Sequence, residues 1–230
     1  HDVQLHLHPQ WLEEAGCQYT NDGWKWNLDY FRLPNLPEGN PNDRLSIRGL
    51  FHQGVKTLEE LLTPIDPTYK CIAFRAGGYC IQPSETIIKA MLEVGILADS
   101  SVAKGAYNTT YPYFYDFRNA HSNCDPWWAD PQDITKPSQN HENTILEVPI
   151  YSYPSTVFHQ ILGRYSQWDY CSLNSAQLTS MFQKYLSTHT EGLQVHPGVH
   201  IIVMMGHPKF FSNHYEFKKC LQELSKYTTI

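Results

Sequence analysis

The sequence of 230 residues lacks the features that mark several protein classes. No apolar run approaches the roughly 20 residues that a transmembrane helix needs. The 17 basic residues form no cluster, and the net charge of −6 argues against binding to nucleic acid or to an anionic membrane. The six cysteines contain no Cys-x-x-Cys pair, which indicates buried thiols in a reducing, cytoplasmic setting more than disulfides or a thiolate zinc site.

Two residue classes are abundant. Twelve histidines are many for this length, and Phe, Trp and Tyr together make up 13% of the chain. Imidazoles ligate metals and transfer protons near neutral pH, and flat aromatic rings can stack on the faces of sugars. The 41% hydrophobic and 17% charged content is that of an ordered globular domain.

Strand and helix patterns alternate along the chain, which predicts the α/β class with a mainly parallel sheet, either a barrel or doubly wound. Residues 3–8 alternate as a half-buried strand does, and Val199–Met205 reads as a strand covered on both faces. We expect further strands at 71–74, 96–98 and 145–150, and helices at 46–62, 84–94, 175–188 and 213–227.

A single domain of residues 1–230 is expected, with an insertion at about 105–144. The insertion is rich in Tyr, Trp, Pro, Asp and Asn and has little periodicity. Loops of this length inside a compact domain are usually functional or disordered. The density of aromatic residues favours a functional role, as a sugar platform that would include Tyr113, Trp127 and Trp128.

Chemically useful side chains follow the predicted strands. His6 and His8 end the first strand, and Arg75, Asp99 and His207 end three others. The carboxyl ends of parallel strands form the active-site face of α/β folds. These residues are therefore predicted to share one cleft. Taken singly, Arg75 could be a surface residue, Asp99 a turn or cap residue, and His207 a structural residue.

His6-Leu7-His8 is a candidate metal-binding pair. Alternation places both imidazoles on one face of the strand, about 6.6–7 Å apart at Cα. From that separation both rings can reach one ion at about 2.0–2.1 Å. The alternative is a pair of polar residues on an exposed strand face.

Five segments, in order, resemble motifs of the NodB-homology polysaccharide deacetylases, closest to the deacetylase-like proteins of bacterial O-antigen and surface-polysaccharide clusters. They are the segments 1–6, 74–79 (Phe-Arg-Ala-Gly-Gly-Tyr), 95–101 (ending Asp-Ser-Ser), 146–149 (Leu-Glu-Val-Pro) and 205–208 (Met-Gly-His-Pro). The resemblance covers nearly the whole chain. It implies a distorted (β/α) barrel and removal of an acyl group from an N-acetyl amino sugar in polysaccharide, O-antigen or lipopolysaccharide biosynthesis.

The resemblance also implies roles for individual residues. His6 and His8 would hold a divalent metal, most simply Zn²⁺, and Arg75 would orient the catalytic base. A backbone N–H near Tyr79 would bind the oxyanion. His207, tuned by Asp99, would protonate the departing amine.

The chain departs from the family pattern at two points. The Asp pair of the family's first motif, a base and a metal ligand, would lie before His1, so we expect a preceding segment that carries the first strand. The family's second metal-binding histidine falls at Gln10, so either His8 replaces it or the site is altered. Two alternatives therefore stay open: an inactive carbohydrate-binding protein on the same fold, and a hydrolase of another ester or amide.

Overall fold

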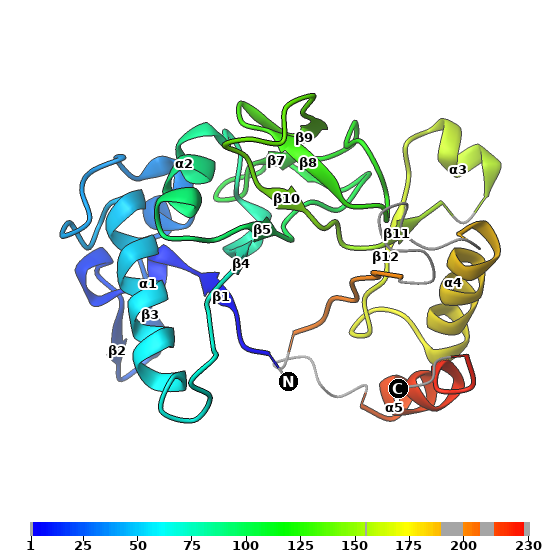
Figure 1. Ribbon diagram of the computed structural model, residues 1–230. Coiled ribbons are helices and arrows are strands. Elements are labelled where there is room, and N and C mark those ends of the chain that lie inside the picture. The colour runs from blue at the N-terminus through cyan, green and yellow to red at the C-terminus, as the bar shows by residue number, and fades with distance from the viewer. Residues whose placement is uncertain (1, 155, 190–199, 208–213, 228–230) are drawn as a thin grey trace.

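The computed structural model describes residues 2–154, 156–189, 200–207 and 214–227 (Figure 1). Its helices are α1 (Ile47–Leu62), α2 (Glu85–Glu93), α3 (Val157–Ile161), α4 (Ser175–Thr188) and α5 (His214–Leu224). Its strands are β1 (Leu5–Leu7), β2 (Gln18–Thr20), β3 (Gly23–Lys25), β4 (Ala73–Ala76), β5 (Ala98–Asp99), β6 (Tyr107–Asn108), β7 (Tyr115–Asp116), β8 (Trp127–Asp130), β9 (Asp133–Pro137), β10 (Leu146–Glu147), β11 (Ser152–Tyr153) and β12 (Ser166–Gln167).

The central sheet has six strands in the order β1-β4-β5-β10-β8-β9. The first four run parallel, with His6 opposite Arg75 in the β1–β4 register, and β8 and β9 continue the sheet antiparallel. The described residues therefore combine helices with a six-stranded, mainly parallel sheet. Among the described residues the sheet is open, with β1 and β9 at its edges, so the closed barrel stays a prediction.

Helices α1 and α2 cover the β1–β4 half of the sheet (Figure 1). The Ser46 side chain caps α1 by accepting a hydrogen bond from Gly49 N–H. One face of α1, including Leu50, Phe51 and Val55, is buried in the larger hydrophobic core. Helix α2 ends where Gly95 adopts φ +84°, the stop that its sequence predicts.

A second core lies beneath α4 and α5, at the opposite end of the molecule in Figure 1. A capping box between Asn174 and Gln177 starts α4, whose buried side chains include Phe182 and Tyr185. Trp168 packs in the same core and donates its ring N–H to the carbonyl oxygen of Leu178. All six cysteines are free thiols, and five are buried, as the cysteine spacing predicts.

Two segment predictions were wrong. Within the described part of Val199–Met205, only isolated parallel bridges form, Ile150–Val203 and Asp169–Met205, and most of these residues are half-buried. The apolar run packs against α4 and α5 on one side instead of lying within a continuous sheet. The segment 105–144 is not irregular throughout, because it contains β6 to β9 and extends the central sheet.

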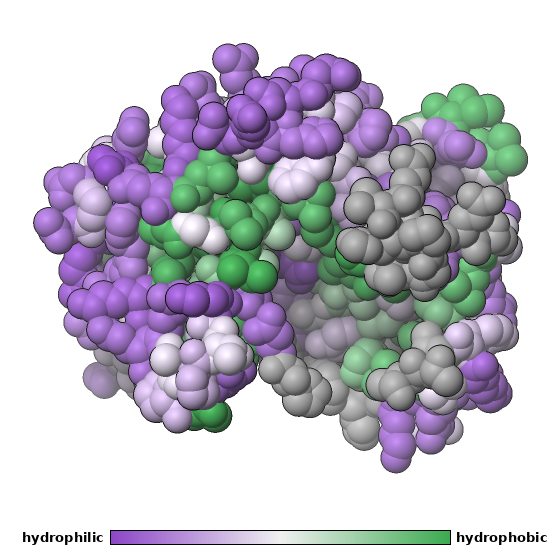
Figure 2. All heavy atoms as spheres, viewed as in Figure 1, coloured by the Kyte–Doolittle hydropathy of each residue, from purple (hydrophilic) through white to green (hydrophobic). Residues whose placement is uncertain are grey.

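Helix α3 contributes no buried side chain to either core. Its apolar side chains Val157, Phe158 and Ile161 are exposed, and Figure 2 shows a hydrophobic patch at the upper right, where α3 lies in Figure 1. Among the described residues, no helix combines the length and the apolar content needed to cross a bilayer.

Candidate functional site

A cleft of about 930 Å³ opens where β1 and β4 end and the segment after β5 begins. The predicted site residues His6, His8, Arg75 and His207 all line it. These residues come from three parts of the chain that lie far apart in sequence. The structure therefore places these residues at one site. His6 and Arg75 come from adjacent parallel strands, whereas His207 comes from a segment outside the central sheet.

His6 and His8 present their Nε2 atoms to each other at 3.0 Å. The His6 Nδ1 atom lies 2.8 Å from the carbonyl oxygen of Arg75, which can only accept a hydrogen bond. Nδ1 of His6 therefore carries the proton, and its Nε2 presents a lone pair toward His8. A ligand histidine is commonly oriented in this way, by a hydrogen bond from its other ring nitrogen.

Gln10 provides the corresponding partner for His8. Its side-chain amide nitrogen lies 3.2 Å from His8 Nδ1, and its amide oxygen is buried without a partner. A half turn of the amide presents the oxygen to His8 Nδ1–H instead. Both Nε2 lone pairs then converge on one point. The 3.0 Å between the two Nε2 atoms is close to the roughly 3.3 Å that separates two nitrogen ligands on a tetrahedral ion. Gln10 thus fits the role of an orienting residue, and His8 that of the ligand.

His6 is suited to bind a cation because its surroundings favour the neutral imidazole. Burial, together with the positive charges of Arg75 and His207, lowers the pKa of His6 below its usual value, although its bond to Arg75 opposes this shift. A neutral imidazole keeps the lone pair that a metal needs. Imidazole suits Zn²⁺ and similar ions, so these two residues fit a divalent metal of that class.

Arg75 reaches across the cleft wall to Ser100. Its Nε donates to the Ser100 carbonyl oxygen at 2.8 Å, and its Nη2 donates to the Ser100 hydroxyl at 3.0 Å. These bonds fix the guanidinium at the cleft, where it can bind an anionic or carbonyl oxygen. They do not show a carboxylate base oriented by Arg75.

Asp99 does not line the cleft, contrary to prediction. It is fully buried, and its two carboxylate oxygens accept hydrogen bonds from the backbone N–H and the hydroxyl of Ser101 at 2.7 and 2.9 Å. Glu147, also fully buried, lies beside it. Burial and the adjacent Asp99 carboxylate raise the pKa of Glu147 well above its usual range, which favours its protonated form. The pair organises the turn below the site, and Asp99 acts on the cleft only through its neighbours.

His207 and Tyr79 form the far wall of the cleft. The His207 backbone N–H donates to Cys171 Sγ at 3.1 Å, and its ring is exposed to the cleft. Gly78 and Tyr79 both have positive φ, +60° and +62°, which is rare for an aromatic residue and is typical of strained functional turns. The Tyr79 hydroxyl contacts Met205, so its side chain supports the wall rather than projecting into the cleft.

Aromatic rings make up much of the remaining lining. Trp11 stacks on His8 with ring centroids 4.0 Å apart, and Tyr113 meets Phe31 edge-on at 4.7 Å. Trp26 also lines the cleft, and 46% of its surface is exposed. The sequence prediction included Tyr113 but missed both tryptophans. Only the proximity of Trp11 to the histidine pair could have indicated a role for it.

Trp127 and Trp128 were wrongly assigned to the sugar platform, because neither is part of the cleft lining. Trp127 is buried in the larger core and donates its ring N–H to the Ile134 carbonyl oxygen. Trp128 points to the other face of β8, where it stacks on His141. Alternation along β8 sends these neighbouring rings to opposite faces of the sheet.

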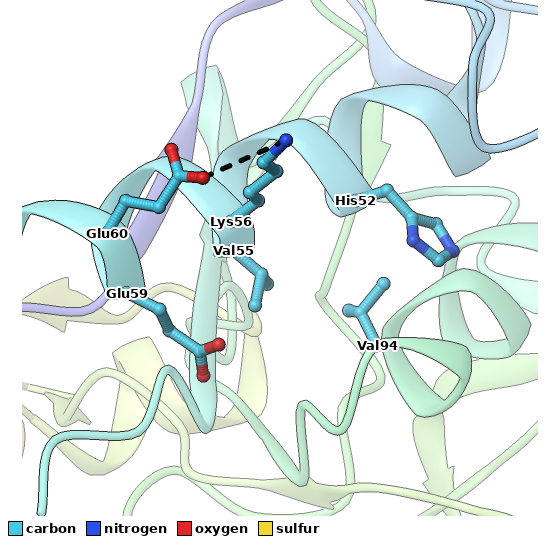
Figure 3. Close-up of a pocket in the computed structure, with 6 residues that line it drawn as sticks. All are labelled: His52, Val55, Lys56, Glu59, Glu60 and Val94. Carbon is cyan, nitrogen blue, oxygen red and sulfur yellow. Dashed lines mark ion pairs between the residues drawn. The ribbon is translucent and has the colours of Figure 1, made fainter. Parts of the chain in front are cut away.

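A second pocket, of about 280 Å³, is lined by side chains of α1 and by Val94, the C-cap residue of α2 (Figure 3). Figure 3 shows Lys56 directed at Glu60, with which it forms an ion pair at 3.8 Å. The remaining lining is a mixture of aliphatic and acidic side chains with His52 at one end. None of the predicted site residues lies there, and its polar groups do not converge on one point.

No family model, curated protein or solved structure matches the chain. The assignment of function therefore depends on the cleft itself and on the motif resemblance described above.

Proposed function

We propose that the cleft binds an N-acetyl amino sugar and hydrolyses its amide with the help of a divalent metal held by His6 and His8. The observation that carries the proposal is the His6–His8 pair, whose Nε2 atoms lie 3.0 Å apart on the wall of an aromatic cleft that also contains Arg75 and His207. A zinc-like ion bound there supplies Lewis-acid polarisation of the amide carbonyl.

The residues of the chain supply binding and proton transfer. The exposed rings of Trp11, Trp26 and Tyr113 are placed to stack on the sugar, and Arg75 offers donors to the oxygen that becomes negative in the transition state. Water adds to the carbonyl carbon and releases a proton to the solvent, the C–N bond breaks, and acetate leaves. His207, protonated, gives its proton to the departing amine.

Acetate release by the purified protein tests this proposal. His207→Ala should lower kcat by about 10²–10⁴-fold, the usual contribution of a general acid, and should leave the affinity for the deacetylated sugar unchanged. His141→Ala is the matched control, because His141 lies outside the cleft lining. Equal turnover in the wild type and in His207→Ala would remove His207 from the mechanism.

A carbohydrate-binding protein without turnover is the second candidate, and one observation favours it. Among the described residues no carboxylate lines the cleft, whereas hydrolysis needs a base for the attacking water. This candidate predicts no acetate release from any variant. It also predicts loss of sugar affinity in Trp11→Ala, but not in Trp128→Ala.

A further inference from the structure

Three side chains that take no part in the cleft meet at the end of α4. The Cys124 Sγ atom lies 3.2 Å from His189 Nε2, and the Asp125 carboxylate oxygen Oδ1 lies 3.4 Å from the same nitrogen. The three donor atoms all lie within 4.8 Å of one another. His189 is the C-cap residue of α4, and the other two residues lie just before β8.

The orientation of His189 is fixed by its second nitrogen. Nδ1 lies 3.0 Å from the carbonyl oxygen of Tyr185, and the imidazole stacks on the Tyr185 ring with centroids 4.5 Å apart. Nδ1 also lies 2.8 Å from the hydroxyl oxygen of Thr188. With Nδ1 held on this side, Nε2 faces the sulfur of Cys124 and the carboxylate of Asp125.

Ser122 arranges the two other side chains. Its hydroxyl donates to Asp125 Oδ2 at 3.1 Å, which leaves Oδ1 facing His189. The same hydroxyl oxygen accepts hydrogen bonds from the backbone N–H groups of Cys124 and Asp125. Supporting bonds of this kind surround the ligands of metal sites and set their orientation.

The spacing agrees with that of a metal site. Bonds of about 2.3 Å to sulfur and about 2.0–2.2 Å to nitrogen and oxygen place tetrahedral ligands about 3.3–3.6 Å apart. The separations of 3.2 and 3.4 Å from His189 Nε2 to Cys124 Sγ and to Asp125 Oδ1 differ from this by a few tenths of an ångström at most, and the sulfur and the carboxylate oxygen lie within 4.8 Å of each other. The negative end of the α4 dipole adds to the attraction for a cation.

We propose that Cys124, Asp125 and His189 form a second metal site, for a borderline-soft divalent ion such as Zn²⁺. A mixed sulfur, nitrogen and oxygen ligand set excludes Mg²⁺ and Ca²⁺, which prefer oxygen ligands alone. The Asp125 side chain is 58% exposed, so the site is open to solvent on one side and a water molecule can complete the tetrahedron. The bound ion would fasten the segment before β8 to the end of α4.

Titration of the full chain with Co²⁺ tests the site, because a thiolate ligand on cobalt gives a charge-transfer absorption that nitrogen and oxygen ligands do not. The absorption should appear in the wild type, vanish in Cys124→Ser, and persist in Cys17→Ser, which alters another buried thiol. It should also persist in His6→Ala, because the two sites share no residue. This result is independent of whether the cleft binds metal or hydrolyses a sugar.

A second variant keeps the test decisive if Cys124→Ser fails to fold. Asp125→Asn alters a mostly exposed side chain and should lower the Co²⁺ affinity by about tenfold or more, since even outer-shell partners contribute about 10–100-fold. Zn²⁺ should raise the unfolding temperature of the wild type and of His6→Ala through binding to the native state, and less so that of Asp125→Asn. A wild type without charge-transfer absorption, or a Cys124→Ser protein that retains it, would overturn the proposal.

Discussion

Replacing Gln10 with methionine should weaken metal binding in the cleft without weakening the fold. Gln10 is 3% exposed, and its amide bonds to His8 Nδ1 at 3.2 Å. Methionine has a similar volume and cannot orient His8. Loss of an outer-shell partner typically lowers metal affinity by about 10–100-fold, or about 1.4–2.7 kcal/mol.

The stability of the variant should change little, for a reason that is specific to this site. The substitution removes one hydrogen bond, a loss of about 0.5–1.5 kcal/mol, but it also removes a buried polar atom without a partner, whose desolvation costs about 1–3 kcal/mol. The central expectation is a stabilisation of about 1 kcal/mol. Gln4→Met provides the opposite control, because the Gln4 side-chain oxygen accepts hydrogen bonds from the backbone N–H groups of Ile72 and Ala73, both at 2.8 Å. It should lower stability and leave metal affinity unchanged.

Competition with a chromophoric chelator measures the Zn²⁺ affinity of the cleft. This assay uses a Cys124→Ser background, which removes the second site. Urea unfolding measures the stability. Unchanged affinity in Gln10→Met would refute the orienting role of Gln10. A loss of more than about 2 kcal/mol of stability would refute the argument from the unpaired amide atom.

Three further predictions concern stability. The pKa of Glu147 is raised in the fold, so the wild type loses folding stability as pH rises and this side chain ionises. Gln at this position cannot ionise. In thermal melts, Glu147→Gln should therefore become more stable relative to the wild type as pH is increased. Arg48 and His52 lower the pKa of Glu93 to about 2, so Glu93→Gln should lower the free energy of unfolding by about 1 kcal/mol at pH 7. In urea unfolding, this difference should disappear as pH falls from about 4.5 toward 2. Trp127→Ala should lower the free energy of unfolding by about 3–5 kcal/mol in the same assay, as for a core aromatic residue. A much smaller loss would contradict the placement of Trp127 in the core.

Local patterns in the sequence predicted the elements whose signals were strong. The apolar spacing of residues 46–62 and 175–188 matches α1 and α4 closely. Periodicity failed for Val199–Met205, because an apolar run does not say whether a sheet or a pair of helices covers it.

The grouping of His6 and Arg75 could be predicted because adjacent parallel strands bring their carboxyl ends together, whereas His207 reaches the cleft from a segment outside the central sheet. The cluster of Cys124 with His189 could not be predicted, because 65 residues separate them and no spacing rule links them. The sugar platform was misplaced for a related reason. Aromatic composition cannot distinguish a core ring such as Trp127 from a cleft ring such as Trp11.

Acetate release that depends on Zn²⁺ would show that the cleft is a metal-dependent deacetylase. Cys124→Ser protein, stripped with a chelator, would be titrated with Zn²⁺ in the presence of N-acetylglucosamine oligomers. We expect no acetate before Zn²⁺ is added, and a release that rises with bound Zn²⁺ to a plateau at about one equivalent. When His6→Ala is introduced as well, we expect no acetate at any Zn²⁺ level. Full acetate release from the stripped protein, or a plateau unchanged by His6→Ala, would contradict this function.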